Sequence, residues 1–247
     1  MPRSKSLTDL AAIEAARLGF NPQTQPLITI PTLPGIDQSY LQPDFIEAAF
    51  TQPVQWGVEP LFADLFIPDF SQFPQAIRSA VCVPLVSRPT GLHMLLTRRA
   101  GHLLSHAGQV CFPGGRVEPE DPDAIYAALR ETHEEVGIEP SYIKTLGQQP
   151  IFITTTKYAM LPVVGLVQDG FAVQPDPAEV AEVFEVPLSV LMNPANHRLH
   201  HLPGKNGKER YYFSISWNGY FIWGATAALI RNFYHHLAAA SQQLGRV

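Results

Sequence analysis

Cysteine is scarce in this sequence, since Cys82 and Cys111 are the only two among 247 residues. Two cysteines in so long a chain cannot form the disulfide framework of a small secreted domain, so we expect a reduced, cytoplasmic protein. No apolar run approaches the roughly 18 residues that a membrane span needs. The N-terminus also lacks the long apolar core and small-residue cleavage site of a signal peptide.

Charge is sparse as well. Charged residues make up 16% of the chain, and the formal net charge is −5 at pH 7. A chain without a basic excess has no electrostatic footprint for nucleic acid or for an anionic membrane. We therefore expect neither as a partner. The length is nevertheless sufficient to bury a sizeable core.

Residues 1–76 differ in composition from the rest of the chain. A short helix is predicted over Leu7–Leu18. Residues 21–75 then carry nine prolines, interleaved with large aromatic side chains. So many aromatics argue against disorder. We expect an extended arm with short helical turns near Pro43–Phe50, packed either on the main domain or on the second subunit of a homodimer.

Beyond the arm, residues 77–247 alternate between strand-like and helical patterns, which favours an α/β sandwich. Four segments are predicted strands: Ala80–Val86, Leu92–Thr97, Leu161–Val167 and Val183–Val186. Two segments are predicted helices: residues 122–136 and, near the end of the chain, Phe221–Leu237.

The most informative segment runs from Gly114 to Gly137, GGRVEPEDPDAIYAALRETHEEVG. Three of its glutamates, Glu131, Glu134 and Glu135, stand at i, i+3 and i+4 and would share one face of a helix. Like charges this close repel unless something positive lies between them. A divalent cation suits that position, because Mg²⁺ held by carboxylates commonly bridges substrate phosphates. The segment therefore predicts a metal site for phosphate chemistry.

The same segment carries the local signals of a helix. Asp121 is a suitable N-cap, Pro122 suits the first helical position, and Gly137 provides a stop. An apolar stripe expected to face the core repeats at spacings of 4, 3 and 4: Ile125, Leu129, Thr132 and Val136. The three glutamates fall largely on the opposite, exposed face.

These residues resemble the signature of the Nudix hydrolase family, G-x5-E-x7-R-E-U-x-E-E-x-G-U, in which U is apolar. The matching residues are Gly115, Arg130, Glu131, Glu134, Glu135, Gly137 and Ile138. The sequence departs from the signature in three places. Asp121 stands at the first Glu, eight residues rather than seven follow it, and Thr132 replaces an apolar residue.

Upstream residues are similar to an additional motif of the coenzyme A pyrophosphatase branch of this family, LLTxR(S/A)x3Rx3Gx3FPGG. Leu95–Ala100, Gly108 and Phe112–Gly115 match it, whereas Leu104 stands at its second Arg. The longer spacing in the signature is typical of the same branch. Phe221–Ala227 also resembles a C-terminal segment of that branch.

The resemblance implies a Nudix-type α/β/α sandwich with a mixed sheet over residues 77–247, preceded by the Pro-rich N-terminal extension 1–76. It implies Mg²⁺ or Mn²⁺ as the cofactor and a small nucleotide conjugate as the substrate. The predicted catalytic set is Arg130, Glu131, Glu134 and Glu135, with the three glutamates as metal ligands. Arg130 and Glu134 are i, i+4 neighbours, so the guanidinium can hold that carboxylate in place.

Substrate contacts are predicted for Arg99, His106, Gln109, Gly114 and Gly115. The Gly-Gly turn lets the backbone approach closely and direct N–H groups at phosphate. Arg98 and Arg99 end a strand and point to opposite faces, so at most one reaches the site directly. Glu179 and Glu182 are either a further carboxylate from a distant loop or solvated loop charges.

The sequence thus predicts metal-dependent hydrolysis of a pyrophosphate linkage, first in coenzyme A or an acyl-coenzyme A. The products would be 4′-phosphopantetheine, or its acyl form, and adenosine 3′,5′-bisphosphate. ADP-ribose, NADH or another nucleoside diphosphate derivative is the alternative substrate. A Nudix fold that serves as a ligand-binding or regulatory module is the alternative of another class.

Overall fold

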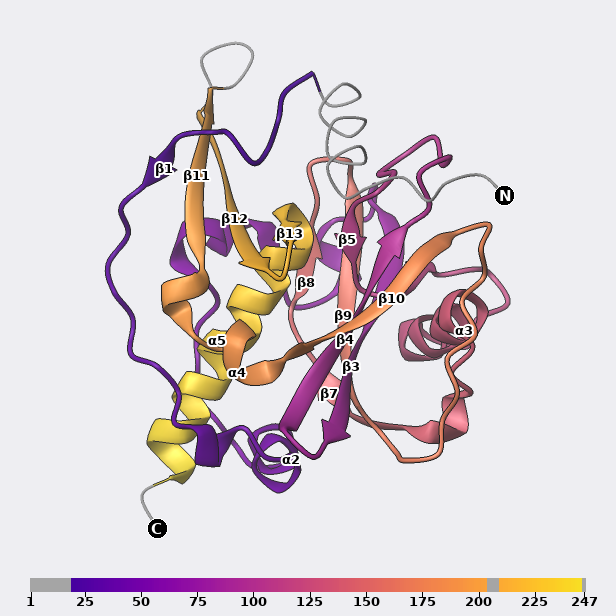
Figure 1. Ribbon diagram of the computed structural model, residues 1–247, viewed down its shortest axis with the longest axis horizontal. Helices are drawn as coiled ribbons and strands as arrows, with labels where there is room; N and C mark the ends of the chain where they lie inside the picture. The colour runs from indigo at the N-terminus through magenta and orange to yellow at the C-terminus, as the bar shows by residue number, and fades with distance from the viewer. Residues whose placement is uncertain (1–18, 204–208, 246–247) are drawn as a thin grey trace.

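The computed structural model describes residues 19–203 and 209–245, and the helix predicted over Leu7–Leu18 lies outside them. The described strands form two sheets, with helix α3 on one side of the larger sheet and α5 on the other (Figure 1). This is the expected α/β/α sandwich. None of the helices in the described residues combines the length and apolar character needed to cross a bilayer.

The larger sheet has nine described strands and is mixed, because β3 and β9 run parallel whereas their neighbours pair antiparallel. Its main path is β10 (Val180–Pro187), β4 (Gly91–Arg99), β3 (Ile77–Arg88), β9 (Tyr158–Val167), β8 (Ile151–Ile153) and β2 (Phe66–Ile67). Beside this path, β5 (Val110–Cys111) pairs with β4, β6 (Gly114–Arg116) with β3, and β7 (Ile143–Gln148) with β9. The four predicted strands lie within β3, β4, β9 and β10.

The smaller sheet has the order β1 (Leu27–Ile28), β11 (Arg198–Pro203), β12 (Glu209–Trp217) and β13 (Tyr220–Trp223). The described α-helices are α2 (Pro43–Thr51), α3 (Ala124–Val136), α4 (Leu188–Leu191) and α5 (Gly224–Leu244). Short 3-10 turns are η1 (Gln38–Tyr40), η2 (Pro60–Leu65), η3 (Phe70–Gln72), η4 (Pro140–Tyr142) and η5 (Pro194–Asn196).

The closing helix begins later than predicted. The prediction began it at Phe221, but Tyr220–Trp223 form β13, which pairs antiparallel with β12, and α5 starts at Gly224. Asn218 and Gly219 form the tight turn of this hairpin with φ of 44° and 83°. An Asn-Gly pair between aromatic segments is a strong hairpin signal, and it outweighs the helical pattern that follows.

Strand β3 separates two hydrophobic cores, because its side chains alternate between the two faces of the sheet. Val81, Val83 and Leu85 belong to the core that contains α5, whereas Ala80 and Cys82 belong to the core under α3. A strand covered on both faces is apolar throughout, which explains the sequence AVCVPLV.

Pro84 lies in the middle of β3 although proline cannot donate a hydrogen bond to a neighbouring strand. On this edge, β6 pairs with Ser79–Val81 and β4 pairs with Leu85–Arg88. Pro84 occupies the gap between the two pairings, next to Cys82, whose N–H donates to the Pro113 carbonyl over 2.9 Å. The proline is tolerated because neither β4 nor β6 pairs with β3 at this residue.

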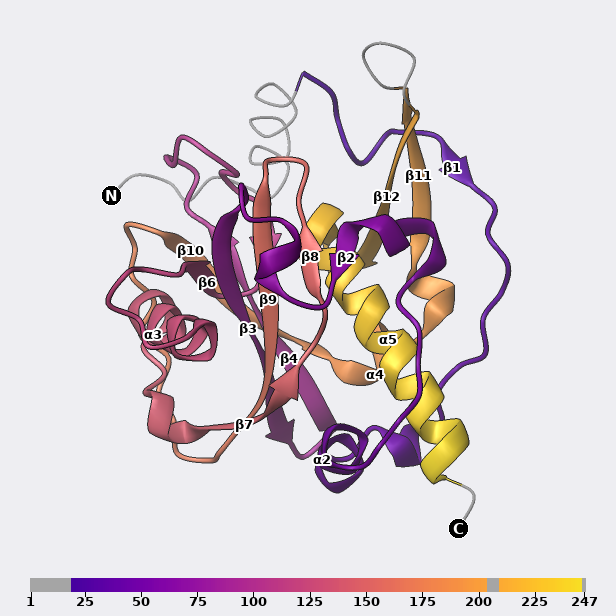
Figure 2. The same cartoon turned by 180° about the vertical axis from the view of Figure 1, so that it is seen from behind.

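The Pro-rich arm packs on its own chain, which was one of the two expected arrangements. It runs along the smaller sheet and then across α5 (Figure 2). Its predicted helical turns near Pro43–Phe50 form α2, and arm residues Leu41, Ile46 and Phe62 are buried in the core that contains α5. The hydroxyl of Tyr212 donates to the Pro22 carbonyl over 2.6 Å. A domain boundary near residue 76 stays a prediction.

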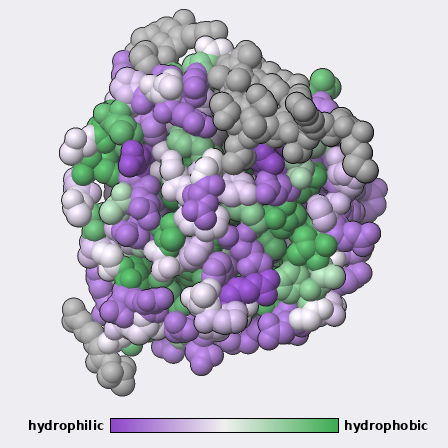
Figure 3. All heavy atoms as spheres, viewed as in Figure 1, coloured by the Kyte–Doolittle hydropathy of each residue, from purple (hydrophilic) through white to green (hydrophobic). Residues whose placement is uncertain are grey.

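Residues of both characters are mixed on the described surface of the face drawn in Figure 1 (Figure 3). Leu27 and Ile28 of β1 are among the exposed large hydrophobic residues, at 56% and 36% of their full exposure. They lie on a two-residue strand at the edge of the smaller sheet. Short edge strands of this kind limit pairing with other chains.

A buried ion pair fastens the arm to α5. Glu59 of the arm accepts from the Arg231 Nε over 2.7 Å and lies 2.8 Å from the His235 Nε2. The Asn232 side chain accepts from the Glu59 N–H, and the Arg231 Nη1 lies 3.3 Å from the His197 Nδ1. Burial alone would raise the pKa of Glu59, but the hydrogen bonds from His235 and Arg231 outweigh it and lower the pKa to about 2.

Two histidines in this region are buried in their neutral form. Burial lowers the pKa of His197 and of His236 to about 4. The His236 ring stacks on Trp56 at 4.7 Å, with its two nitrogens at the Gln149 amide and the Ala49 carbonyl. A protonated ring has no acceptor, so protonation would break the contact with one of these neighbours.

We expect His197 and His236 to lower the free energy of unfolding as the pH is lowered from 6.5 towards 4, against the opposite effect of any buried carboxylate with a raised pKa. In this window the unfolded chain protonates His197 and His236, whereas the folded chain keeps them neutral. One pKa unit corresponds to about 1.4 kcal/mol, so each histidine accounts for at most about 3 kcal/mol. Urea unfolding at several pH values measures the slope. His236→Gln should flatten it and the exposed His102→Gln should not; an unchanged slope in His236→Gln would remove His236 from this account.

Candidate functional site

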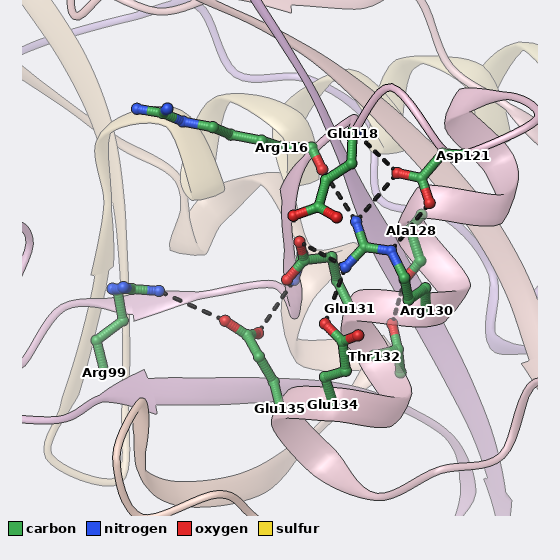
Figure 4. Close-up of polar contacts among 11 residues, drawn as sticks. Arg99, Arg116, Glu118, Asp121, Ala128, Arg130, Glu131, Thr132, Glu134 and Glu135 are labelled. Carbon is green, nitrogen blue, oxygen red and sulfur yellow. Dashed lines mark hydrogen bonds and ion pairs between the residues drawn. The ribbon is translucent and has the colours of Figure 1, made fainter.

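The predicted catalytic residues of α3 lie beside β6, where Arg99 of β4 reaches Glu135 (Figure 4). Gly114 has a φ of +154°, and a Cβ at this position would collide with the backbone of β3. A Cβ at Gly115 would collide with the carboxylate of Glu131. Gly114 is therefore required by its close approach to the sheet, whereas a side chain at Gly115 would displace the Glu131 carboxylate.

The three glutamates of α3 differ sharply in exposure. The side chains of Glu134, Glu131 and Glu135 are 56%, 16% and 4% exposed. The expectation that all three lie on the exposed face is therefore wrong for Glu135. Its oxygen Oε2 accepts from the Gly114 N–H over 3.1 Å, so this N–H is directed at the carboxylate rather than at open space for phosphate.

The N-cap of α3 is Asp123, not Asp121 as predicted. Asp123 accepts from the Tyr126 N–H over 2.8 Å. Asp121 instead accepts from Nε and Nη2 of Arg130 over 2.9 and 3.0 Å. Asp121 stands at the first acidic position of the signature, and it reaches the guanidinium although it is shorter than Glu and one residue more separates it from Arg130. The two departures from the signature thus occur in one ion pair.

Arg130 joins the acidic residues on both sides of it. Besides Asp121, its Nη1 donates to Glu131 over 3.1 Å and to Glu134 over 2.8 Å. Its Nη2 also donates to the Arg116 carbonyl over 3.1 Å. The predicted contact between Arg130 and Glu134 is confirmed. With these partners the guanidinium fixes one carboxylate relative to the next and to the turn that follows β6.

The third departure from the signature is also explained by packing. Thr132 is fully buried under the larger sheet, and its hydroxyl donates to the Ala128 carbonyl one turn earlier over 2.7 Å. The same side chain forms a hydrogen bond with the Cys82 thiol on β3. A hydroxyl with two local partners carries no unsatisfied polar group into the core, so it can replace an apolar residue here.

Arg98 and Arg99 point to opposite faces of β4, as predicted. Arg99 lies on the face that also carries Leu95, and its Nη1 is 3.5 Å from Glu135. Arg98 lies on the face that carries Leu96, where its Nη2 is 2.7 Å from Glu182. Only Arg99 is therefore directed at the carboxylates.

The loop between β4 and β5 carries the remaining predicted substrate contacts. His106 and Gln109 are brought together, with the His106 Nδ1 2.9 Å from the Gln109 side-chain oxygen. Leu104, which stands at the motif's second Arg, is 97% exposed in this loop. Phe112 is buried in the core, so it stabilises the fold rather than lining the site.

Of the two loop carboxylates considered beside the signature, Glu179 is the one near the site. Its charge raises the pKa of both Glu131 and Glu135, after the larger contribution of burial. The loop that carries it is attached to the end of α3, because Gln174 N–H donates to the Val136 carbonyl over 2.8 Å and Asp176 N–H to the Glu135 carbonyl over 3.1 Å. Sequence alone left Glu179 and Glu182 equivalent.

The electrostatics of these carboxylates suit a divalent cation. Burial raises the pKa of Glu135 to about 7, and it also raises the pKa of Glu131; the nearby negative charges add to both shifts. These negatively charged carboxylates repel one another, and their hard oxygen atoms are the ligands that Mg²⁺ and Mn²⁺ prefer. Within the described residues, however, no three acidic, histidine or cysteine side chains converge as ready-made ligands. Arg130 and Arg99 hold the carboxylates instead.

A sequence model of the NUDIX domain matches residues 76–204, which include these site residues. The uncharacterized Nudix hydrolase NudL of Photorhabdus laumondii is 39% identical over 164 residues, 66% of this chain and 84% of that protein. NudL of Escherichia coli K12 is 41% identical over 155 residues, 62% of this chain and 79% of that protein. The solved structure of DR0079 from Deinococcus radiodurans is similar with a TM-score of 0.43 and 16% identity, covering 63% of this chain and 81% of that one. So distant a structural likeness carries no weight beside the sequence matches.

We expect Glu135→Gln to stabilise the metal-free protein at pH 8. The folded-state pKa of Glu135 is raised. The free energy of unfolding therefore decreases as the pH rises from 4.5 through 7, because the buried carboxyl group ionises. Glutamine removes this charge, can still accept from the Gly114 N–H, and should add up to about 3 kcal/mol at pH 8. The gain should vanish at pH 4.

Urea unfolding in the presence of a chelator measures this difference at both pH values. The matched control is Glu120→Gln, an exposed glutamate in the turn before α3, which should leave the stability unchanged. A Glu135→Gln variant less stable than the parent at pH 8 would show that the carboxylate is not under electrostatic strain.

Proposed function

The chain belongs to the Nudix family, and from that premise we propose that it hydrolyses the pyrophosphate linkage of coenzyme A or of an acyl-coenzyme A with Mg²⁺ or Mn²⁺. Hydrolysis of a pyrophosphate bond in a nucleotide derivative is the activity that membership of the family implies. Coenzyme A is the finer proposal. Its products would be 4′-phosphopantetheine, or the acyl form, and adenosine 3′,5′-bisphosphate.

The observation that carries the proposal is the group of α3 carboxylates that are held in place by Arg99, Arg130 and the Gly114 N–H. The charge of Glu131 raises the pKa of Glu135, and Glu179, in the loop before β10, raises the pKa of both. A protein gains nothing in stability from carboxylates of one sign that are partly buried together. We attribute their arrangement to a cation that binds between them.

We propose Glu131, Glu135 and Glu179 as the residues that hold the cation, with the exposed Glu134 as a further ligand. When bound, the cation would polarise phosphoryl oxygens and lower the pKa of a bound water. Arg130 orients Glu131 and Glu134 through its two contacts. Arg99 lies on the same face of the sheet and can donate to phosphate oxygens. A carboxylate left outside the coordination takes the proton of the attacking water.

The choice of coenzyme A rests on the residues that resemble the branch motif. They occupy one continuous stretch, from the end of β4 through the loop 100–109 to the Gly-Gly turn of β6. In this stretch Arg99 contacts Glu135, and the turn contacts Glu131 and Glu135. The stretch also contains Leu104 in place of the motif's Arg, which keeps ADP-ribose, NADH and similar compounds as the alternative substrates.

A ligand-binding or regulatory module is the alternative of another class. A module that only binds a nucleotide has no use for carboxylates that repel the phosphates of its ligand. The negative charge of the cluster therefore favours an enzyme. A homodimer and a cytoplasmic location stay predictions.

The first test is a substrate panel of coenzyme A, an acyl-coenzyme A, ADP-ribose, NADH and a nucleoside triphosphate, each with Mg²⁺, with Mn²⁺ and with a chelator. We expect metal-dependent release of adenosine 3′,5′-bisphosphate from coenzyme A, identified by chromatography, and the highest kcat/KM for that substrate. Faster hydrolysis of ADP-ribose or NADH would replace coenzyme A by the alternative. Tight binding without turnover of any compound would favour the module.

The second test concerns Leu104, because coenzyme A has a 3′-phosphate that ADP-ribose and NADH lack. An Arg at this position can form two parallel charge-assisted hydrogen bonds with a phosphate, so Leu104→Arg should raise kcat/KM for coenzyme A about tenfold to a hundredfold. The same variant should change little on 3′-dephospho-coenzyme A. Equal effects on both compounds, or none, would remove Leu104 from the account of specificity.

A further inference from the structure

Three side chains from three strands meet on the face of β4 that is turned away from the carboxylates. The Arg98 Nη2 of β4 lies 2.7 Å from Oε2 of Glu182 on β10. The Tyr220 hydroxyl of β13 donates to the other oxygen, Oε1, over 2.6 Å. The Tyr220 ring also stacks on Phe184 of β10, with centroids 3.8 Å apart and an interplanar angle of 9°. We call Arg98, Glu182 and Tyr220 the clamp.

The clamp lies directly after an irregularity in β10. Val180 pairs with Arg99 and Glu182 pairs with Arg98, so two steps along β10 correspond to one step along β4 and Ala181 is the extra residue. A bulge of this kind interrupts the regular hydrogen bonding of its strand and is common beside functional sites. Glu179 lies on the other side of the bulge, where its carbonyl accepts from the Ala100 N–H over 2.7 Å.

The position of Glu179 therefore depends on how β10 is held on both sides of the bulge. Before it, the loop is attached to the end of α3 through Gln174 and Asp176. After it, the clamp fixes Glu182 to β4 and to β13. The residue Glu179 itself is exposed, so packing of its own side chain does little to fix it.

Stability alone does not account for the clamp. The Arg98 side chain is only 14% exposed, and its Nε and Nη1 are buried without a hydrogen-bond partner among the described residues. Each buried donor left unsatisfied costs about 1–3 kcal/mol. A buried ion pair can often be replaced by apolar side chains of similar volume without loss of stability. The charged pair therefore stabilises the fold no better than a pair of apolar side chains of similar volume would.

We propose that the clamp is a positioning device that holds Glu179 at the cation site formed with Glu131 and Glu135. Arg98, Glu182 and Tyr220 are positioning residues, because they act through the backbone of β10 and touch neither substrate nor cation. This inference rests on the proposed function, in which Glu179 is a ligand. It also assigns a role to the arginine that points away from the carboxylates.

The test compares the full-length chain with Glu179→Gln, Glu182→Gln and the double variant. The dissociation constant for Mn²⁺ is measured by electron paramagnetic resonance of the free ion, without substrate. We expect Glu182→Gln to weaken Mn²⁺ binding about tenfold, as changes behind a metal ligand commonly do. If Glu182 acts through Glu179, the double variant should bind Mn²⁺ no more weakly than Glu179→Gln alone. Independent, multiplying effects would overturn the proposal.

The matched control is Glu185→Gln. Glu185 also lies on β10 and forms an ion pair with Arg88 over 2.6 Å, beyond the clamp from Glu179. Its replacement should leave Mn²⁺ affinity within about twofold. A second variant, Arg98→Met with Glu182→Met, removes both charges and should keep the melting temperature while it weakens Mn²⁺ binding about tenfold. A merely structural clamp would lower the melting temperature and leave the affinity unchanged, which would overturn the proposal.

The same variants separate this inference from the proposed function. Parent protein that binds Mn²⁺ but cleaves none of the panel substrates would refute the proposed function, while the Mn²⁺ affinities would still decide the role of the clamp. Parent protein that cleaves coenzyme A, with Mn²⁺ affinity equal in all clamp variants, would refute only the clamp. Parent protein that binds no Mn²⁺ would refute both.

Discussion

Burial of like-charged carboxylates beside one another costs free energy, and the surroundings of α3 are arranged to offset that cost. The Glu135 carboxylate is almost fully buried, and it accepts from the Gly114 N–H and faces Arg99. Glu131 is held by Arg130, which the Asp121 carboxylate orients in turn. Each partner supplies positive charge or a donor at a carboxylate that would otherwise be unpaired. Gly114 is needed because only a residue without a Cβ fits against the backbone of β3 at this point.

The departures from the family signature show how such a site tolerates change. The signature's first Glu is Asp121, which is shorter, and the following segment is one residue longer, yet the fork of hydrogen bonds to Arg130 is kept. Thr132 introduces a hydroxyl into a core position, where the Ala128 carbonyl and the Cys82 thiol accommodate it. At Asp121 the carboxylate is preserved although the chain that joins it to Arg130 is longer, whereas at Thr132 a new hydroxyl is paired inside the core.

The second core, around α5, has a different character from the site. The Pro-rich arm contributes Leu41, Ile46 and Phe62 to it and fastens itself to α5 through the buried pair of Glu59 and Arg231. The helix that begins directly after β13 thereby links the arm to the strand that carries Tyr220. In the proposal of a clamp, that strand helps to hold Glu179. The part of the arm that packs on α5 is thus connected to the carboxylates through covalent structure and a few side chains, although the two lie on opposite sides of the larger sheet.

The sequence by itself determined the features that depend on local spacing. The i, i+3, i+4 glutamates, the i+4 contact of Arg130 and Glu134, the alternation that sends Arg98 and Arg99 to opposite faces, and the long apolar strands all follow from periodicity within one element. Only the tertiary structure decided what depends on separate segments meeting. The burial of Glu135, the choice of Glu179 over Glu182 and the arm's place against α5 each join residues that lie tens of residues or more apart in the chain. Periodicity carries no information about such distances, because they are set by how sheets and helices pack.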